Sequence, residues 1–208
     1  MRLFIAINLN NDTRSRLLAM RDRLREHSVR GNFSAPENLH LTLAFLGECD
    51  ANQAAVIKAA MEETRVKPFR LNVDRVGRFK RDGGDIWWAG VQACKPLLEL
   101  QRNLSDRLIA DGFALDRRKY SPHITLGREV ATDGAADTEV AAYVAAGAGV
   151  SMDTRIGADA SIRANAGAGA GNPWAVESFG KIVSSIELMK SERISGKLIY
   201  TPIATVKL

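Results

Sequence analysis

The chain contains two short segments of the same pattern, His40-Leu41-Thr42-Leu43 and His123-Ile124-Thr125-Leu126. In a β-strand, successive side chains point to opposite faces. Each segment therefore predicts a strand with its histidine and threonine on one face and its two apolar side chains on the other. Because the pattern occurs twice, we expect the two strands to form a joint site that contains two imidazoles and two hydroxyls.

The order of the predicted elements indicates an α+β fold in which the two motif strands belong to related units. Apolar runs of strand length occur at 3–9, 39–46, 69–76, 86–93, 123–128, 181–190 and 198–206, and helical spacing of apolar residues occurs at 11–27, 52–64 and 95–110. This order mixes hairpins with crossovers, which is typical of α+β proteins rather than doubly wound sheets. A strand–helix–strand unit that ends in the motif occurs twice, so we expect two similar lobes that face each other.

Three shorter segments give local predictions. Residues 31–38, which include Pro36, predict a loop before the first motif strand. Residues 78–84 predict a hairpin turn that is basic and contains two glycines. Pro202 interrupts the last apolar run, and because proline cannot donate to a sheet ladder, we expect this strand at a sheet edge or with a bulge.

The segment at about 131–172 differs from the rest of the chain in composition. It is rich in alanine and glycine and contains few large apolar side chains. Such a stretch buries too little surface to offset the entropy of ordering it, so we expect a long flexible insertion with a short helical turn at 141–146. The glycines at 167–171 indicate low complexity rather than a nucleotide loop, because no apolar strand precedes them. The chain is thus expected to be one domain of two lobes, 1–208, with this insertion.

Composition restricts the class of protein. The 208 residues are 46% hydrophobic and 25% charged, which suffices for a substantial core. No apolar stretch approaches the roughly 20 residues of a membrane helix, and the first residues resemble a strand rather than an export signal. Cys49 and Cys94 lack the spacing of a zinc site, so we expect free thiols and a cytoplasmic protein. The net charge of +5 favours an anionic partner without identifying it.

Other chemistries that use histidine need residues that the sequence lacks. A catalytic zinc site usually has a third protein ligand, and no HExxH motif, aspartate cluster or Cys/His group provides one. There is no GxxxxGK[ST] loop for a nucleoside triphosphate and no GxSxG motif of a serine hydrolase. We therefore expect a site without metal or cofactor.

Two histidines suffice for the opening of a cyclic phosphodiester. This reaction needs a base that takes a proton from water and an acid that protonates the departing ribose oxygen, on opposite sides of phosphorus. An imidazole with a pKa near 6.5 can do either at neutral pH. The threonine hydroxyls can donate to phosphoryl oxygens, and Arg128 can neutralise the phosphate. The residues alone do not decide which histidine is the acid.

Several stretches together carry a resemblance to a known family. They are RLFIAINL, PENLHLTLAFLGE, DIWWAGV, SPHITLGR and the terminal residues 198–202. With these stretches the sequence resembles the 2H phosphoesterase superfamily, and within it the RNA 2′,3′-cyclic phosphodiesterase family, also called the 2′-5′ RNA ligase family. The Ala/Gly-rich insertion departs from that family, whose members are usually shorter there.

The resemblance implies a fold, a reaction and residue assignments. The fold is bilobal and α+β, with two pseudo-symmetric lobes whose antiparallel-rich sheets surround a central groove and whose helices lie outside. The reaction is metal-independent hydrolysis of an RNA 2′,3′-cyclic phosphate end to a 2′-phosphate. By resemblance, His40 is the proton donor to the leaving 3′ oxygen and His123 is the proton acceptor that activates water, while Thr42, Thr125 and Arg128 bind phosphate.

Further residues are candidates for contacts with RNA. Tyr120 and one of Trp87 or Trp88 are candidates to stack on a base. The candidates to follow an RNA backbone are Arg78, Lys80, Arg81, Arg117, Arg118 and Lys119.

Two alternatives to hydrolysis remain at this point. One is 2′-5′ RNA ligation by the same site, and the other is a nucleotide-binding or RNA-binding module without turnover. The expected partner in each case is RNA or a nucleotide with a 2′,3′-cyclic phosphate, including tRNA fragments, and we expect a monomer that does not bind membranes.

Overall fold

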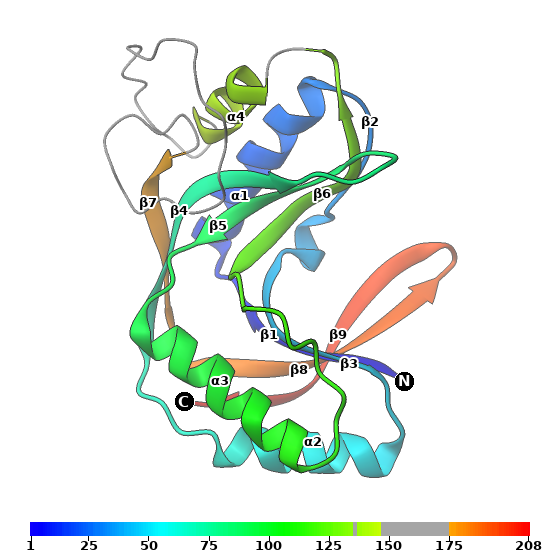
Figure 1. Cartoon of the computed structure of the whole chain (residues 1–208), viewed down its shortest axis with the longest axis vertical. Helices are drawn as coiled ribbons and strands as arrows, with labels where there is room; N and C mark the ends of the chain where they lie inside the picture. The colour runs from blue at the N-terminus through cyan, green and yellow to red at the C-terminus, as the bar shows by residue number, and fades with distance from the viewer. Residues whose placement is uncertain (135–136, 147–174) are drawn as a thin grey trace.

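The fold consists of two antiparallel sheets with helices on their outer sides (Figure 1). The computed structural model describes residues 1–134, 137–146 and 175–208. The first sheet has the strands β3 (His40–Glu48), β1 (Arg2–Asn8), β8 (Ser185–Ile194) and β9 (Lys197–Lys207), in that order. The second sheet has the strands β2 (Ser28–Phe33), β6 (His123–Thr132), β5 (Asp85–Val91), β4 (Phe69–Phe79) and β7 (Ala175–Val183). The predicted α+β class is confirmed, and each sheet contains one motif strand.

The helices tie the two sheets together. Helix α1 (Asn11–Glu26) connects β1 of the first sheet to β2 of the second, and it packs against β2, β6 and β7 of the second sheet. Helix α3 (Lys95–Ala110) connects β5 to β6 of the second sheet, and it packs against β4 of that sheet, against β3 of the first sheet and against α2 (Ala51–Glu63). Figure 1 shows α1 above the second sheet and α2 and α3 below the first. One apolar core runs through both sheets, so the two motif strands are held together by shared packing.

Two predicted elements are wrong in their boundaries. The loop expected at 31–38 is occupied by the end of β2 and by a short 3-10 helix, Pro36–Asn38. Strand β2 is an edge strand with mostly exposed side chains, so its sequence lacks the apolar alternation that would indicate a strand. The single strand expected at 181–190 is two strands, β7 and β8, which belong to different sheets and are separated by Ser184.

The strand that contains Pro202 has both features expected of it. Strand β9 lies at the edge of the first sheet. Met189 pairs with Pro202 while Leu188 pairs with Ala204, so Ile203 forms a bulge. The proline is therefore accommodated where the ladder is interrupted.

The segment expected to be a flexible insertion contains more regular structure than its composition suggested. Strand β6 extends to Thr132, and α4 (Asp137–Ala146) packs against α1 and β4. The side chains of Val140 and Val144 are fully buried there. Small residues allow α4 to approach α1 closely, so this helix needs few large side chains. Residues 147–174, the remainder of the expected insertion, lie outside the described residues.

No helix in the described ranges combines the length and the apolar character needed to cross a membrane.

The shared core predicts that one core substitution in α3 destabilises the whole domain. Leu104 is fully buried in α3, and Leu104→Ala should lower the free energy of unfolding by about 2–5 kcal/mol in a urea titration. The transition should remain single, because both sheets share the core. Ile109→Ala, at an exposed position of the same helix, is the control and should change stability by less than about 1 kcal/mol. Two separate transitions would contradict a shared core.

Candidate active site

Each motif strand has the alternation that its sequence predicts. In β3, Leu41 and Leu43 are buried while His40 and Thr42 are partly exposed on the other face. In β6 the corresponding residues alternate in the same way: Ile124 and Leu126 are buried, and His123 and Thr125 are partly exposed. Both histidines are thus the first residue of a strand whose back packs into the core.

The structure brings the two motifs together. Strand β3 forms the edge of the first sheet and contacts β6 of the second. The hydroxyl of Tyr120, just before β6, donates to the backbone carbonyl of Thr42 over 2.9 Å. His123 is near enough to His40 to lower the pKa of His40 by charge repulsion, a smaller effect than burial. The predicted joint site of two imidazoles is therefore consistent with the fold.

Both imidazoles are oriented by the same backbone interaction. Nδ1 of His40 donates to the carbonyl of Asn38 over 2.8 Å, and Nδ1 of His123 donates to the carbonyl of Ser121 over 2.7 Å. A carbonyl only accepts hydrogen bonds, so the proton of each neutral ring lies on Nδ1 and the lone pair on Nε2. The hydroxyl of Thr42 donates to Nε2 of His40 over 3.0 Å. Each Nε2 therefore has the lone pair that accepts a proton.

Aromatic rings surround His40 on its own sheet. The ring centroid of Tyr200, in β9, lies 5.2 Å from that of His40 with the planes nearly perpendicular, at 83°. The Phe4 ring, in β1, lies 4.9 Å from His40. Both rings limit the rotation of the imidazole and reduce its contact with water.

His123 has an equivalent environment on the second sheet. The Phe79 ring lies 5.2 Å away with its plane at 85° to the imidazole, and the Trp88 ring lies 6.1 Å away. Sequence analysis missed Tyr200, Phe4 and Phe79 as neighbours of the histidines. They belong to strands far from the motifs in sequence, so no spacing rule connects them with the site. The available signal was that Phe4 and Tyr200 lie in family-like stretches at the two ends of the chain.

Burial and one arginine determine the charge of the site. Burial lowers the pKa of His40 from 6.5 to about 4, and it also lowers the pKa of His123. The Arg128 guanidinium adds to the decrease for both histidines. Arg128 is exposed and makes no ion pair within the described residues. At pH 7 the site therefore combines two neutral imidazoles with one unneutralised cation, which favours an anionic ligand.

The three aromatic residues predicted as candidates to stack on a base have contacts within the protein. Trp87 is fully buried, so its ring offers no face to a ligand. The Tyr120 hydroxyl is used in the bond to Thr42, and burial raises its pKa. Trp88 contacts His123 and covers Gly77, where an added Cβ would lie 2.2 Å from the indole ring. These residues position the motif strands.

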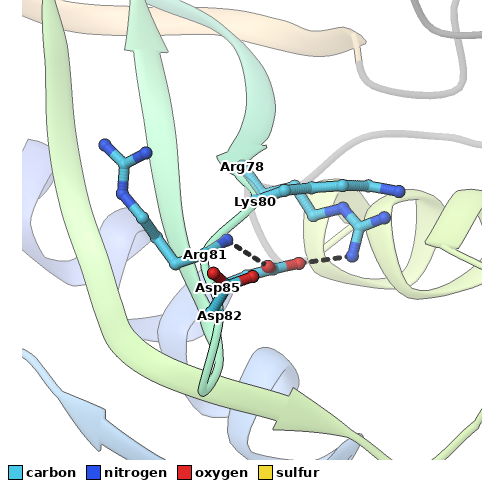
Figure 2. Close-up of a pocket in the computed structure, with 5 residues that line it drawn as sticks. All are labelled: Arg78, Lys80, Arg81, Asp82 and Asp85. Atoms are coloured by element: carbon cyan, nitrogen blue, oxygen red, sulfur yellow. Dashed lines mark hydrogen bonds and ion pairs between the residues drawn. The ribbon is translucent and has the colours of Figure 1, made fainter.

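The predicted basic residues of the β4–β5 turn line a cavity at the tip of this hairpin (Figure 2). Asp85, at the turn, pairs with Val130 near the end of β6, whereas His123 begins that strand. Arg78 forms an ion pair with Asp85 over 2.5 Å, and both side chains are largely buried. Lys80 and Arg81 are exposed beside a cavity of about 510 Å³.

The second predicted basic run also contains one neutralised residue. Arg118 forms an ion pair with Asp116 over 2.5 Å, while Arg117 and Lys119 are exposed. Of the six predicted backbone contacts, Arg78 and Arg118 thus already have carboxylate partners.

The side chains near the histidines do not form a typical metal site. In the part of the chain that the structure describes, no group of three or more His, Cys, Asp or Glu residues is arranged to hold a metal ion. The charge of Arg128 acts on His40, and a positive charge at this place disfavours the binding of a metal ion and favours the binding of a phosphate. The donor set therefore fits an anion better than a cation.

Comparison with known proteins assigns the family. The family described as LigT like phosphoesterase matches residues 7–88 and 90–156. The chain is a LigT-like phosphoesterase. This family belongs to the 2H superfamily, so the resemblance inferred from the motifs is confirmed.

Curated relatives and solved structures agree with the family. The RNA 2′,3′-cyclic phosphodiesterase of Archaeoglobus fulgidus is 33% identical over 131 residues, which cover 62% of this chain and 72% of that protein. The protein of the same name from Thermotoga maritima is 34% identical and covers 62% of this chain, with 70% of its own length matched. The crystal structure of E. coli LigT in apo form is 24% identical, covers 99% of this chain and 96% of its own, and has a TM-score of 0.68, which supports the bilobal α+β fold.

The depressed pKa of His40 predicts a pH-dependent stability of this LigT-like phosphoesterase. Between about pH 6.5 and pH 4 the unfolded chain binds a proton at His40 that the folded chain does not, so stability falls as the pH falls. The slope attributable to His40 is at most about 1.4 kcal/mol per pH unit. In urea titrations at pH 7 and pH 5, His40→Asn should lose less stability on acidification than the wild type.

His27→Asn is the matched control for this titration. His27 follows α1, contacts Asp133 at the surface and lies outside the motifs. A loss of stability that is equal in the wild type and His40→Asn would contradict the depressed pKa.

The charge of Arg128 predicts a second measurable shift. Arg128→Gln should raise the pKa of both His40 and His123 in an NMR titration, because the guanidinium lowers both. Arg81→Gln, which removes a cation at the β4–β5 turn, should have a much smaller effect. Unchanged histidine titrations in Arg128→Gln would show that this side chain does not face the site.

Proposed function

We propose that this LigT-like phosphoesterase hydrolyses the 2′,3′-cyclic phosphate at an RNA end to a 2′-phosphate by a two-histidine, metal-independent mechanism. The observation that carries the proposal is that both imidazoles bind a backbone carbonyl through Nδ1 and keep Nε2 for proton transfer. Support comes from the relatives at 33% and 34% identity that are named RNA 2′,3′-cyclic phosphodiesterases.

The proposed first event is phosphate binding. The cyclic phosphodiester carries one negative charge, which Arg128 neutralises and which the hydroxyls of Thr42 and Thr125 contact by hydrogen bonds. The bound charge raises the pKa of the nearby imidazoles, whose values are depressed in the empty site. One imidazole can then be protonated near neutral pH while the other remains a base.

The proposed chemical step uses the two histidines on opposite sides of phosphorus. Nε2 of His123 takes a proton from water as the water oxygen bonds to phosphorus. Nε2 of His40 gives a proton to the ribose 3′ oxygen as the bond between phosphorus and that oxygen breaks. The products are a 2′-phosphate and a 3′-hydroxyl, and the two histidines exchange protonation states.

The assignment of His40 as the acid follows the family resemblance, because both histidines have the same carbonyl contact. A difference exists at Nε2, since the hydroxyl of Thr42 donates to His40 and must move to a phosphoryl oxygen before His40 can carry a proton there. Phosphate binding would therefore release Nε2 of His40 at the moment when protonation is favoured.

Other properties of the proposed enzyme remain predictions. They are tRNA fragments as substrates, a monomeric state and a cytoplasmic location. Ligation, the joining of a 2′,3′-cyclic phosphate to a 5′-hydroxyl as a 2′-5′ linkage, would use the same two histidines, with the 5′-hydroxyl in place of water as the group that gives its proton to His123 and bonds to phosphorus.

The test of the proposal is turnover of an oligonucleotide with a 2′,3′-cyclic phosphate in the presence of a chelator. The wild type should form a 2′-phosphate end, and His40→Ala or His123→Ala should reduce the rate by about 10²–10⁴-fold. Addition of an oligonucleotide with a 5′-hydroxyl shows whether ligation competes. Loss of turnover in chelator, or a 3′-phosphate product, would contradict the proposed mechanism.

A substrate with sulfur at the bridging 3′ position separates the acid from the base. A thiolate is a much better leaving group than an alkoxide and departs without protonation. His40→Ala should therefore regain most of its rate with the sulfur substrate, whereas His123→Ala should not. Recovery of His123→Ala instead would reverse the assignment.

A further inference from the structure

The face of the first sheet that carries His40 has a cluster of aromatic rings. The Phe4 ring lies 4.9 Å from the His40 imidazole, and the Tyr200 ring lies 4.9 Å from Phe4 and 5.2 Å from His40, so these three rings contact one another. The Phe45 ring lies 6.0 Å from Phe4. Strand β1 thus contributes the Phe4 ring, which contacts both His40 and Phe45. The side chains of His40, Phe4, Tyr200 and Phe45 therefore share one face of the sheet.

Phe45 is the exposed member of this cluster. Its side chain is 62% exposed, whereas Phe4 is 2% exposed. The strand period alone would place Phe45 in the core with Leu41 and Leu43. The register of β3 against β1 shifts there, because Thr42 pairs with Ala6 and Ala44 with Ile5, so Leu43 is the extra residue of a bulge. The bulge turns a large apolar ring to the same face as His40 and into water.

The Phe45 ring lies close to the motif without touching the His40 imidazole. Their backbone positions pair with Phe4 and Asn8, which are four residues apart along β1, or about 13 Å. The Phe4 ring lies 4.9 Å from the imidazole and 6.0 Å from the Phe45 ring, so these two rings are at most about 11 Å apart. Phe45 is thus within reach of a nucleotide that precedes a cyclic end bound at His40.

The charges beside Phe45 are complementary to a nucleic acid backbone. Arg2 lies two residues from Phe4 on the same face of β1, is exposed, and makes no ion pair in the described ranges. Its charge opposes the rise in the pKa of Tyr200 that burial causes, so Arg2 lies near the aromatic cluster. Arg2 also lines a cavity of about 510 Å³ at this end of the sheet, together with Arg193 of the β8–β9 hairpin.

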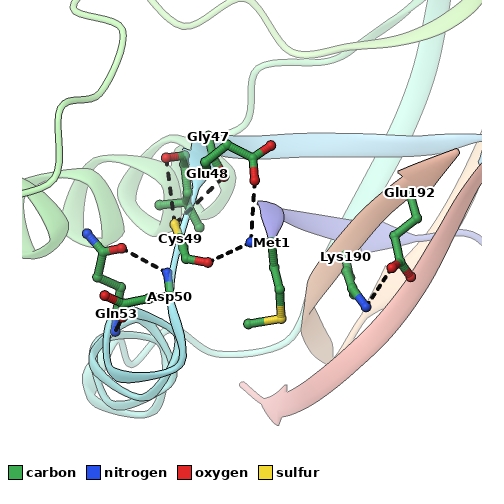
Figure 3. Close-up of polar contacts among 9 residues, drawn as sticks. Met1, Gly47, Glu48, Cys49, Asp50, Gln53, Lys190 and Glu192 are labelled. Atoms are coloured by element: carbon green, nitrogen blue, oxygen red, sulfur yellow. Dashed lines mark hydrogen bonds and ion pairs between the residues drawn. The ribbon is translucent and has the colours of Figure 1, made fainter.

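The carboxylates at this cavity are already paired (Figure 3). Glu48 lies 3.3 Å from the amino group of Met1, and Glu192 lies 2.7 Å from Lys190. Their pairing leaves Arg2 and Arg193 as the available cations. An exposed aromatic ring on a sheet next to unpaired arginines is the combination with which proteins bind single-stranded RNA.

We propose that this face binds single-stranded RNA on the 5′ side of the cyclic phosphate, with the penultimate base stacked on Phe45 and a backbone phosphate beside Arg2. The proposal rests on the proposed function for the position of the cyclic end. It makes the enzyme selective for oligonucleotide ends over mononucleoside cyclic phosphates, and it provides little sequence selectivity because every base has a π face.

The test compares binding and turnover of a trinucleotide and a mononucleotide. Affinity is measured for the two 2′-phosphate products, and kcat/KM for the two 2′,3′-cyclic substrates. In Phe45→Ala, the affinity for the trinucleotide relative to the mononucleotide should fall about tenfold, and the kcat/KM ratio of the two substrates should fall equally. Phe45→Trp should retain both ratios. Ile182→Ala, which removes an exposed apolar side chain from β7, should leave the ratio unchanged.

The salt dependence tests the contact of Arg2. Arg2→Gln should reduce the slope of log affinity against log salt for the trinucleotide by about 0.7, the value for one phosphate contact with a single strand.

The outcomes separate this proposal from the proposed function. If the wild type turns over both substrates and Phe45→Ala keeps the wild-type ratio, stacking on Phe45 is wrong while hydrolysis stands. If neither substrate is turned over but Phe45→Ala weakens only the trinucleotide product, the RNA face stands and hydrolysis fails. If Phe45→Ala changes only the oligomeric state in sedimentation, the ring belongs to a protein interface and the proposal is overturned.

Discussion

A hydrogen bond from Nδ1 of each histidine to a carbonyl two residues earlier is the interaction on which the site depends. It fixes the tautomer of both rings, because a carbonyl cannot donate. It also fixes the direction of each Nε2, since the ring cannot rotate without breaking the bond. The two motifs use the same local geometry at the start of two different strands, which explains why one short pattern recurs in a chain whose lobes are otherwise different.

The electrostatics of the site follow from burial. The aromatic neighbours of each imidazole exclude water and lower its pKa, so the empty site keeps both rings neutral and carries the charge of Arg128. An anion between the rings would reverse this state, because its charge favours an imidazolium. The protonation needed for acid catalysis is thereby coupled to the presence of substrate.

The fold and the site were predictable from the sequence where one physical rule dominates. The period of two identified both motif strands and their buried sides, and it correctly placed His40 and His123 at partly exposed positions. The same rule fails at Phe45, because a bulge at Leu43 changes the face of the strand, and at β2, whose side chains are mostly exposed. The aromatic neighbours of the histidines come from distant strands, so only the tertiary structure brings them to the site. The packing of α1 on the second sheet and of α3 against both sheets has the same origin, since each helix has an apolar face that does not specify its partner.

The most direct test of the account is a crystal structure with a nucleoside 2′-phosphate bound. We expect the phosphorus atom between the two Nε2 atoms, with Nε2 of His40 and of His123 each within hydrogen-bond distance of a different phosphoryl or ribose oxygen. Both Nδ1 bonds to the backbone carbonyls should be retained, and the guanidinium of Arg128 should contact the phosphate. A phosphate that contacts only one imidazole, or an imidazole that binds it through Nδ1, would contradict the account.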